Sequence, residues 1–267
     1  MRGLMNRVGP ASHDVQIRLR TNLASLVAPK SQPSLPVEHN FYPQQPTCQI
    51  PNLHYLLKKF LGERDDGFYV EVGAYDGVLV SNTWGLAERG WRGLLIEPVP
   101  HLADLCRENY AHRERVSVIQ AAIGRTDSRI TLHLGDVFTT ANADLLDEFG
   151  SISWAASSLT SQNISVDCLP LDRVLRENGV LQNFDLLVVD VEGFETEIFA
   201  GFDLDVWRPK MLIVELTDTH PDLHSTARHD ALLGRRLVDA GYVITHKDWI
   251  NTVFVREDVW NEAVHSS

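Results

Sequence analysis

The sequence predicts an α/β protein in which helices cover both faces of a mostly parallel sheet that ends in an antiparallel strand pair. Short apolar runs alternate with helix-length segments from Phe68 onwards. Two of these runs, Phe184–Asp190 (FDLLVVD) and Met211–Glu215 (MLIVE), stay apolar up to a final acid, which is typical of central parallel strands. Two further runs, at 242–245 and 252–255, flank a turn at 246–251 and predict a hairpin.

The chain of 267 residues is long enough for one such domain with an appendage. Prolines at positions 33, 36, 43 and 46 interrupt regular structure before the domain. We therefore expect a partly mobile N-terminal arm over residues 1–46 and a single domain over residues 47–267. Within the arm, Val15–Val27 has the spacing of a short amphipathic helix, and a lid or a dimerisation arm is the alternative role for this segment.

The net charge and the cysteine content indicate which binding partners and which cellular compartment to expect. The net charge of −12 disfavours nucleic acid and anionic membrane surfaces as partners, because phosphate groups would be repelled. The three cysteines form no C-x-x-C pair, which favours free thiols in a reducing cytoplasm. No apolar run approaches the ~20 residues that span a bilayer, and the first residues lack the apolar stretch of a secretory signal.

The segment Phe68–Pro98 has the pattern strand, glycine turn, helix, strand, which suits one βαβ unit. Gly73 and Gly77 frame the turn, where the missing Cβ atoms permit a tight bend and a closely approaching ligand. Glu97 ends the second strand, 20 residues beyond Gly77, where an acid can accept hydrogen bonds from both hydroxyls of a ribose. The turn lacks the middle glycine that admits a pyrophosphate, which favours a nucleoside without phosphates.

Elsewhere the pattern predicts further elements. Helices are expected at 52–61 (with Asn52 as N-cap), 101–110, 169–178 (with Pro170 near the first turn) and 227–240, and strands at 116–120, 129–134 and 164–168. Residues 139–160 have few periodic features and are expected to form an insertion or loop that borders a substrate pocket.

Several segments in order, VEVGAYDG, SNT, GWRGLLIEP, AAIG and FDLLVVDVEGFE, resemble the FkbM-type family of S-adenosylmethionine-dependent methyltransferases. The resemblance covers roughly Phe68 to Val255. It implies the class I methyltransferase (Rossmann-like) fold, S-adenosylmethionine as cofactor, and methyl transfer to a hydroxyl oxygen of a saccharide or secondary metabolite. The expected cofactor-binding residues are Glu71, Gly73, Ala74, Asp76, Gly77, Asn82, Glu97, Pro98, Gln120, Ala121, Ala122 and Asp190.

Methyl transfer to an oxygen needs alignment of donor and acceptor and removal of the hydroxyl proton. Asp190 and Glu192 are the first candidate bases, although Asp190 could instead hold the cofactor's amine and Glu192 could cap the following helix. His220 is the candidate histidine base. The second device is a divalent metal, Mg²⁺, held by Asp190, Glu215 and Asp218.

Two other functions stay open at this point. An NAD-dependent oxidoreductase would also use Glu97 for a ribose, and a nucleoside-binding domain without turnover could act as an assembly partner. The expected partner is a small-molecule or saccharide acceptor, with homo-oligomer formation as a further option. Trp249 could stack on a sugar or cover the core.

Overall fold

The computed structural model describes residues 41–265, so the predicted helix Val15–Val27 and most of the predicted arm lie outside the described residues. The end of the predicted arm belongs to the folded unit. Tyr42 is 1% exposed, and its hydroxyl donates to the Gly62 carbonyl oxygen at 2.6 Å. Its ring packs edge-on against Trp91. The folded unit therefore begins before residue 47.

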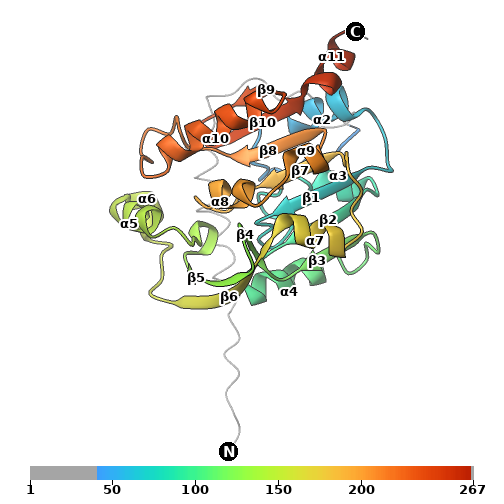
Figure 1. Ribbon diagram of the computed structural model, residues 1–267. Helices are drawn as coiled ribbons and strands as arrows, with labels where there is room; N and C mark the ends of the chain where they lie inside the picture. Colours follow the sequence, from blue (N-terminus) through green and yellow to red (C-terminus); the bar gives the residue numbers. More distant parts are fainter. Residues whose placement is uncertain (1–40, 266–267) are drawn as a thin grey trace, which may run out of the picture.

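A seven-stranded sheet forms the centre of the molecule (Figure 1). Its strands are β1 (Phe68–Val72), β2 (Arg92–Ile96), β3 (Val116–Ile119), β7 (Leu186–Val189), β8 (Met211–Glu215), β9 (Tyr242–Lys247) and β10 (Asn251–Arg256). Their order is β3-β2-β1-β7-β8-β10-β9. All neighbouring pairs are parallel up to β8, whereas β10 is antiparallel to both β8 and β9. This order confirms the predicted Rossmann-like sheet with its final antiparallel pair.

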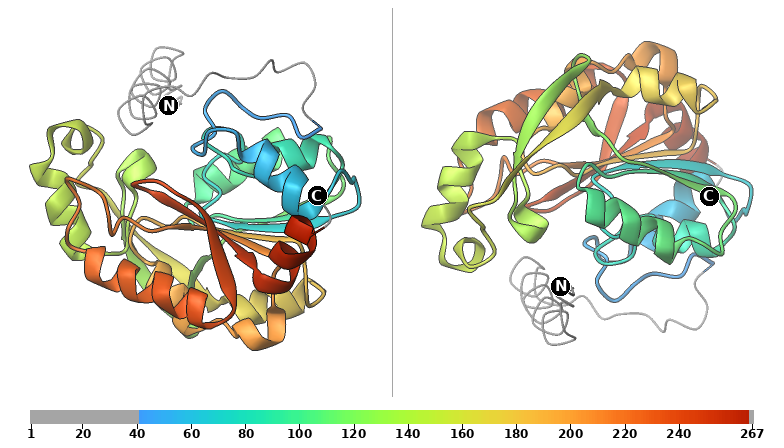
Figure 2. Two further views of the ribbon diagram at one scale, coloured as in Figure 1. Left: turned by 90° about the horizontal axis from the view of Figure 1, so that it is seen from above. Right: turned by 90° about the horizontal axis from the view of Figure 1, so that it is seen from below.

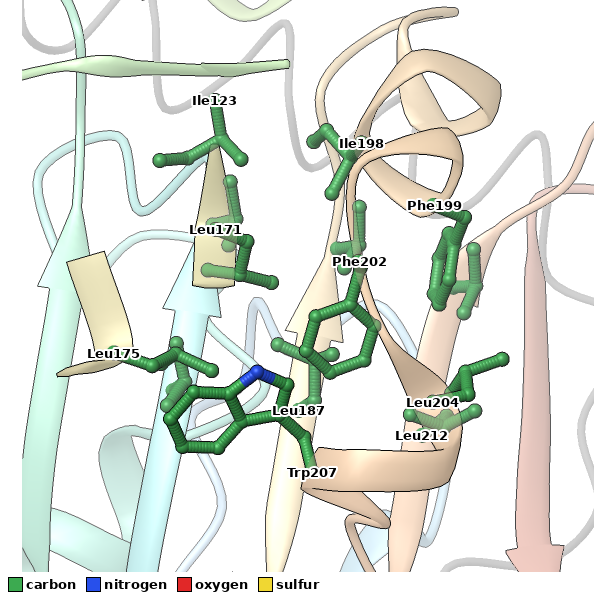
Figure 3. Close-up of a cluster of buried hydrophobic side chains, with 14 of the residues drawn as sticks. Ile123, Leu171, Leu175, Leu187, Ile198, Phe199, Phe202, Leu204, Trp207 and Leu212 are labelled. Atoms are coloured by element: carbon green, nitrogen blue, oxygen red, sulfur yellow. The ribbon is translucent and has the colours of Figure 1, made fainter. Parts of the chain in front are cut away.

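Helices cover both faces of the sheet (Figure 2). One face packs against α2 (Leu53–Leu61), α3 (Trp84–Glu88), α4 (Pro100–Asn109) and α11 (Glu257–His265). The other packs against α7 (Leu171–Glu177), α8 (Glu195–Ala200), α9 (Leu204–Trp207) and α10 (Ala227–Asp239). On this second face Leu187 and Leu212 of the central strands meet Phe202 and Trp207, all buried (Figure 3). Both faces of β7 and β8 are covered, which explains their continuous apolar sequence.

A second sheet of three strands, in the order β4-β6-β5, lies beside the main one. It consists of β4 (Ala122–Gly124), β5 (Ser128–His133) and β6 (Asn163–Pro170), and the short 3-10 helix η2 (Asp136–Phe138) follows β5. The expected loop at 139–160 is wrong in part, because it contains α5 (Ala143–Ser151) and α6 (Ser153–Ala156), which lie side by side (Figure 1). The Asn142 side chain caps α5, and Leu145 and Phe149 bury its apolar face.

The structure differs from the sequence-based expectations at three places. Asn52 has a left-handed φ of 59° and makes no side-chain cap, so α2 begins without one. The helix expected from residue 169 begins at Leu171, and Pro170, the last residue of β6, is at its N-cap position, near the first turn as predicted. The helix α11 was not predicted. In residues 41–265, no helix has the length and apolar character needed to cross a membrane.

Candidate active site

A cleft opens where the parallel strands β1, β2 and β7 end, between the main sheet and the small one. Six of the predicted cofactor-binding residues line it: Gly73, Glu97, Pro98, Ala121, Ala122 and Asp190. Glu192 lines it as well. The carboxyl ends of strands are where doubly wound sheets bind ligands, so the cleft is the candidate active site.

Glu97 is fixed at the end of β2 with its carboxylate at the cleft. It is 4% exposed, Oε2 accepts from the Tyr75 N–H at 2.9 Å, and Oε1 accepts from the Val99 N–H at 2.8 Å. Burial raises the pKa of this carboxyl to about 7. Because an ionised carboxylate accepts about four hydrogen bonds, capacity remains for a bound diol. The geometry suits the predicted ribose contact.

Gly73 brings the loop after β1 against the loop after β7. Its φ is 85°, and a Cβ added to it would lie 1.7 Å from the carbonyl oxygen of Asp190. The Asp190 N–H donates to the Val72 carbonyl oxygen at 3.0 Å, which extends the β1–β7 pairing into these loops. Only glycine fits this contact.

Glu71 does not line the cleft, although it was predicted to bind cofactor. Its carboxylate is buried on the α3 side of the sheet and accepts from the Thr83 hydroxyl at 2.7 Å and the Ser81 hydroxyl at 3.2 Å. Burial raises the pKa of Glu71 to about 7. The structure gives it a role in tying the segment before α3 to β1.

The other predicted cofactor residues outside the cleft lining are Ala74, Asp76, Gly77, Asn82 and Gln120. Asp76 accepts from the backbone of the following turn, and Asn82 donates to Gln49. A Cβ on Gly77 would lie 2.6 Å from the Tyr110 ring, so its glycine serves packing rather than ligand approach. Ala74 is buried in the core, and Gln120 is exposed.

Three acids meet at the ends of β7 and β8. Asp190, Glu192 and Glu215 each offer a carboxylate oxygen within 4.8 Å of the other two. The Glu192 N–H donates to Glu215 Oε2 at 3.1 Å, and Glu192 has a left-handed φ of 55°. Burial and the charges of Glu192, Asp190 and Glu195 raise the pKa of Glu215 well above its usual value. These are oxygen donors of the kind that Mg²⁺ prefers.

The prediction that Asp218 belongs to this group is wrong. Its carboxylate pairs with the Lys247 ammonium at 2.7 and 2.8 Å, and it is not one of the three acids that meet. Glu192 occupies the third position instead. The backbone of Glu192 is left-handed, which brings its N–H and its carboxylate to Glu215. The sequence contains no signal that predicts this conformation.

His220 lies near the acids in sequence but does not line the cleft. It is 7% exposed, its Nδ1 accepts from the Asp222 N–H at 3.1 Å, and burial lowers its pKa. The ring lies between two indoles, with centroids 6.1 Å from Trp154 and 6.2 Å from Trp249. The three rings form an aromatic row from α6 to the β9–β10 hairpin, and Trp249 is 45% exposed.

Sequence reasoning missed a contact across one side of the cleft. The Tyr75 hydroxyl donates to Asp136 Oδ1 at 2.5 Å, and both residues line the cleft. Both have left-handed φ values, 54° and 58°. The bond joins the loop after β1 to η2. Tyr75 stands inside the glycine turn, but its partner is 61 residues away and has no local signal.

Comparison with known proteins agrees with this architecture. The family model "Methyltransferase FkbM domain" matches residues 71–244. The 2-O-methyltransferase NoeI of Sinorhizobium fredii (strain NGR234) is 27% identical over 182 residues, which cover 66% of this chain and 72% of NoeI.

Solved methyltransferases are similar at lower identity. An O-methyltransferase from Bacillus cereus has 16% identity and a TM-score of 0.41, with 93% of both chains covered. The precorrin-6y C5,15-methyltransferase of Geobacter metallireducens has 13% identity and a TM-score of 0.40, covering 76% of this chain and 87% of that one. At these scores the fold class rests on this chain's own strand order.

The sheet order and the cleft at its strand ends define a Rossmann-like protein with a ligand site at the carboxyl ends of its parallel strands. The chain belongs to the FkbM methyltransferase family. This membership decides against the NAD-dependent oxidoreductase considered above.

Proposed function

We propose that this protein transfers the methyl group of S-adenosylmethionine to a hydroxyl oxygen of a small acceptor, a saccharide or a secondary metabolite. The observation that carries the proposal is the single cleft that joins Glu97 to Asp190 and Glu192. Glu97 can accept hydrogen bonds from the two hydroxyls of a ribose, and the carboxylates of Asp190 and Glu192 belong to the same cleft, which Gly73 also lines.

In this proposal the cofactor lies along the ends of β1, β2 and β7. Glu97 accepts the ribose hydroxyls, and the small side chains Ala121 and Ala122 leave a flat apolar wall for the adenine. Asp190 is suited to the cofactor's amine because it lines the cleft and its backbone contacts Gly73. The methyl group would then face Glu192.

The reaction is an in-line displacement at the methyl carbon. The acceptor oxygen forms a bond to that carbon, the carbon–sulfur bond breaks with its electron pair going to sulfur, and the hydroxyl proton goes to a carboxylate. Glu192 is the proposed base because it lines the cleft, whereas His220 does not. The oxygens of Asp190, Glu192 and Glu215 also fit Mg²⁺, which when bound would lower the pKa of the acceptor hydroxyl.

Two observations bear on the acceptor. The relative NoeI is named as a 2-O-methyltransferase, which favours an oxygen as the methyl acceptor. The aromatic row of Trp154, His220 and Trp249 favours a sugar-like ring. His220 lies in the loop after β8, the strand that ends at Glu215, and the Trp249 indole is 45% exposed. Aromatic faces pack well against the apolar C–H surface of a ring-shaped ligand.

The remaining parts of the proposal concern partners and compartment. The acidic net charge disfavours nucleic acid, and the three cysteines are free, which suits a reducing cytoplasm. A homo-oligomer is compatible with the exposed edge strand β9.

A transfer assay tests this function. The full chain is incubated with S-adenosylmethionine labelled in its methyl group and a panel of saccharides and hydroxylated small molecules, with and without Mg²⁺. We expect label in one acceptor class, and Glu192→Gln is expected to lower kcat by about 10²–10⁴-fold. Glu177→Gln, which changes an exposed acid paired with Arg173, serves as the matched control. Transfer at the parental rate by Glu192→Gln would overturn its assignment as base.

A further inference from the structure

Asn251 lies directly opposite Glu215 across the antiparallel pair β8–β10. In such a pair, opposed Cβ atoms are about 4.5–5.5 Å apart. The two side chains share a face of the sheet. Met211 and Ile213 precede Glu215 at alternate positions, Val253 and Val255 follow Asn251 in the same way, and all four belong to one core cluster. Alternation along a strand therefore directs both polar side chains to the same side.

The amide oxygen of Asn251 is buried without a hydrogen-bond partner among the described residues. The side chain is 2% exposed, and Oδ1 is a buried atom with no donor within reach. Leaving such a group unsatisfied costs about 1–3 kcal/mol, so most buried polar atoms in folded proteins have a partner. Asn251 lies opposite Glu215, so a single group bound between the two side chains would be a partner for both the Asn251 amide oxygen and the Glu215 carboxylate.

The hairpin fixes the backbone of Asn251 firmly. The Asp248 carboxylate accepts from the N–H groups of Ile250 and Asn251 at 2.8 and 2.7 Å, and the Asp248 N–H donates to the Asn251 carbonyl oxygen at 3.0 Å. On the other side, the Leu216 N–H donates to the Ile250 carbonyl oxygen at 2.7 Å. The side chain is thus delivered to the end of β8 by a rigid turn.

We propose that the Asn251 amide oxygen joins the carboxylates of Asp190, Glu192 and Glu215 in one site for a hard divalent cation such as Mg²⁺ or Mn²⁺. The inference rests on the proposed function, in which a cation near the acceptor hydroxyl is useful, and it extends the acid group at the ends of β7 and β8 to a third strand, β10. Carboxylate and amide oxygens together are a donor set that such cations take. One cation would supply the buried amide oxygen with a partner and would also bind the three close carboxylates.

Charge at the site is consistent with this reading. Asp190, Glu192 and Glu215 offer carboxylate oxygens within 4.8 Å of one another, and the repulsion between ionised carboxylates this close is what a divalent cation would relieve. The competing arrangement is an amide turned so that its NH₂ group donates to Glu215 while the acids share protons. In that case no cation is needed.

Titration of the full chain with Mn²⁺, followed by the electron paramagnetic resonance of free Mn²⁺, separates the two arrangements. We expect one Mn²⁺ per chain that Mg²⁺ displaces. Asn251→Ala is expected to weaken Mn²⁺ binding by at least about tenfold, whereas Asn251→Asp, which keeps an oxygen, retains it. Asp218→Asn is the matched control, because this nearby acid pairs with Lys247 and its loss leaves the affinity unchanged. Circular dichroism of each variant shows whether it has folded.

Absence of Mn²⁺ binding by the parent chain at millimolar concentration would overturn the inference, as would equal affinity of folded Asn251→Ala and the parent. Binding of S-adenosylhomocysteine, measured on the same samples, keeps this failure distinct from failure of the proposed function. A chain that binds the nucleoside but no Mn²⁺ contradicts only the cation site. A chain that binds Mn²⁺ but no nucleoside contradicts the proposed function.

Discussion

The carbonyl oxygen of Asp190 occupies the space that a side chain at Gly73 would need, 1.7 Å from where a Cβ would stand. The two loops that carry the candidate cofactor and acid residues are therefore held together by backbone contact. This contact fixes the position of the loop after β1 relative to the loop after β7.

Gly73→Ala is expected to separate these loops and abolish nucleoside binding, because the clash involves backbone that cannot rotate away. Gly179→Ala is the matched control, since Gly179 also has a positive φ of 63° but no atom lies within 4 Å of an added Cβ. The control should lose only about 1–2 kcal/mol in its free energy of unfolding, which is the cost of placing an alanine in a left-handed conformation. Chemical denaturation and nucleoside titration of both variants measure the difference. Equal effects of the two substitutions would show that the close contact is unimportant.

The buried carboxyl of Glu71 predicts a pH dependence of stability. Its pKa rises from 4.5 to about 7 on folding, so between these values the folded state binds more protons than the unfolded state. The free energy of unfolding therefore falls as pH rises through this window. Relative to Glu71→Gln, which has no such ionisation, the parent should lose about 3 kcal/mol between pH 4.5 and 7. Urea denaturation at several pH values measures this, and a constant difference between the two proteins would contradict it.

The hydrogen bond from Tyr75 to Asp136 predicts slow exchange of the bound nucleoside. It joins two loops that line the cleft, so its removal should let them part more readily. Tyr75→Phe is expected to raise the dissociation rate of S-adenosylhomocysteine several-fold and to lower stability by about 1 kcal/mol. Stopped-flow displacement provides the rate. Tyr55→Phe, at a residue 41% exposed, is the control, and an unchanged rate in Tyr75→Phe would argue against a closing role.

The exposed indole of Trp249 predicts a contribution to acceptor binding rather than to chemistry. Trp249→Ala is expected to raise the KM for the acceptor about three- to tenfold with kcat nearly unchanged, and Trp249→Phe should restore much of the affinity. Leu181→Ala, at a residue 72% exposed, serves as control. Steady-state kinetics with varied acceptor test this. A fall in kcat with constant KM would assign Trp249 a different role.

Most of the fold could be predicted from the sequence, because the central strands are apolar on both faces and glycines mark the turns. It predicted a loop where α5 and α6 stand, although Asn142 followed by Leu145 and Phe149 carries the signal of a capped helix with an apolar face. Both helices are short, so their apolar residues repeat over too few turns to give a clear helical pattern.

The site was partly predictable for a physical reason. Acids at the ends of neighbouring parallel strands must lie at one edge of the sheet, so Glu97, Asp190 and Glu215 could be assigned to it. Which acids face the cleft could not be predicted. Glu71 sits within its strand and is satisfied by Ser81 and Thr83.

The remaining site features depend on contacts between distant segments. The left-handed backbone of Glu192 and the pairing of Asp218 with Lys247 decide which acid joins Glu215. The register that sets Asn251 opposite Glu215 is likewise a property of the assembled sheet.

The central claim is that Glu97 binds the ribose of S-adenosylmethionine, and calorimetric titration tests it most directly. The purified chain is titrated with S-adenosylhomocysteine and, separately, with NAD, and the titrations are repeated on Glu97→Ala and Glu97→Gln. We expect the parent chain to bind S-adenosylhomocysteine with micromolar affinity. We expect this affinity to fall more than about tenfold in both variants, because hydrogen bonds to a charged group contribute about 1.5–3 kcal/mol. Binding of NAD instead, or of neither nucleotide nor nucleoside by the parent chain, would contradict it.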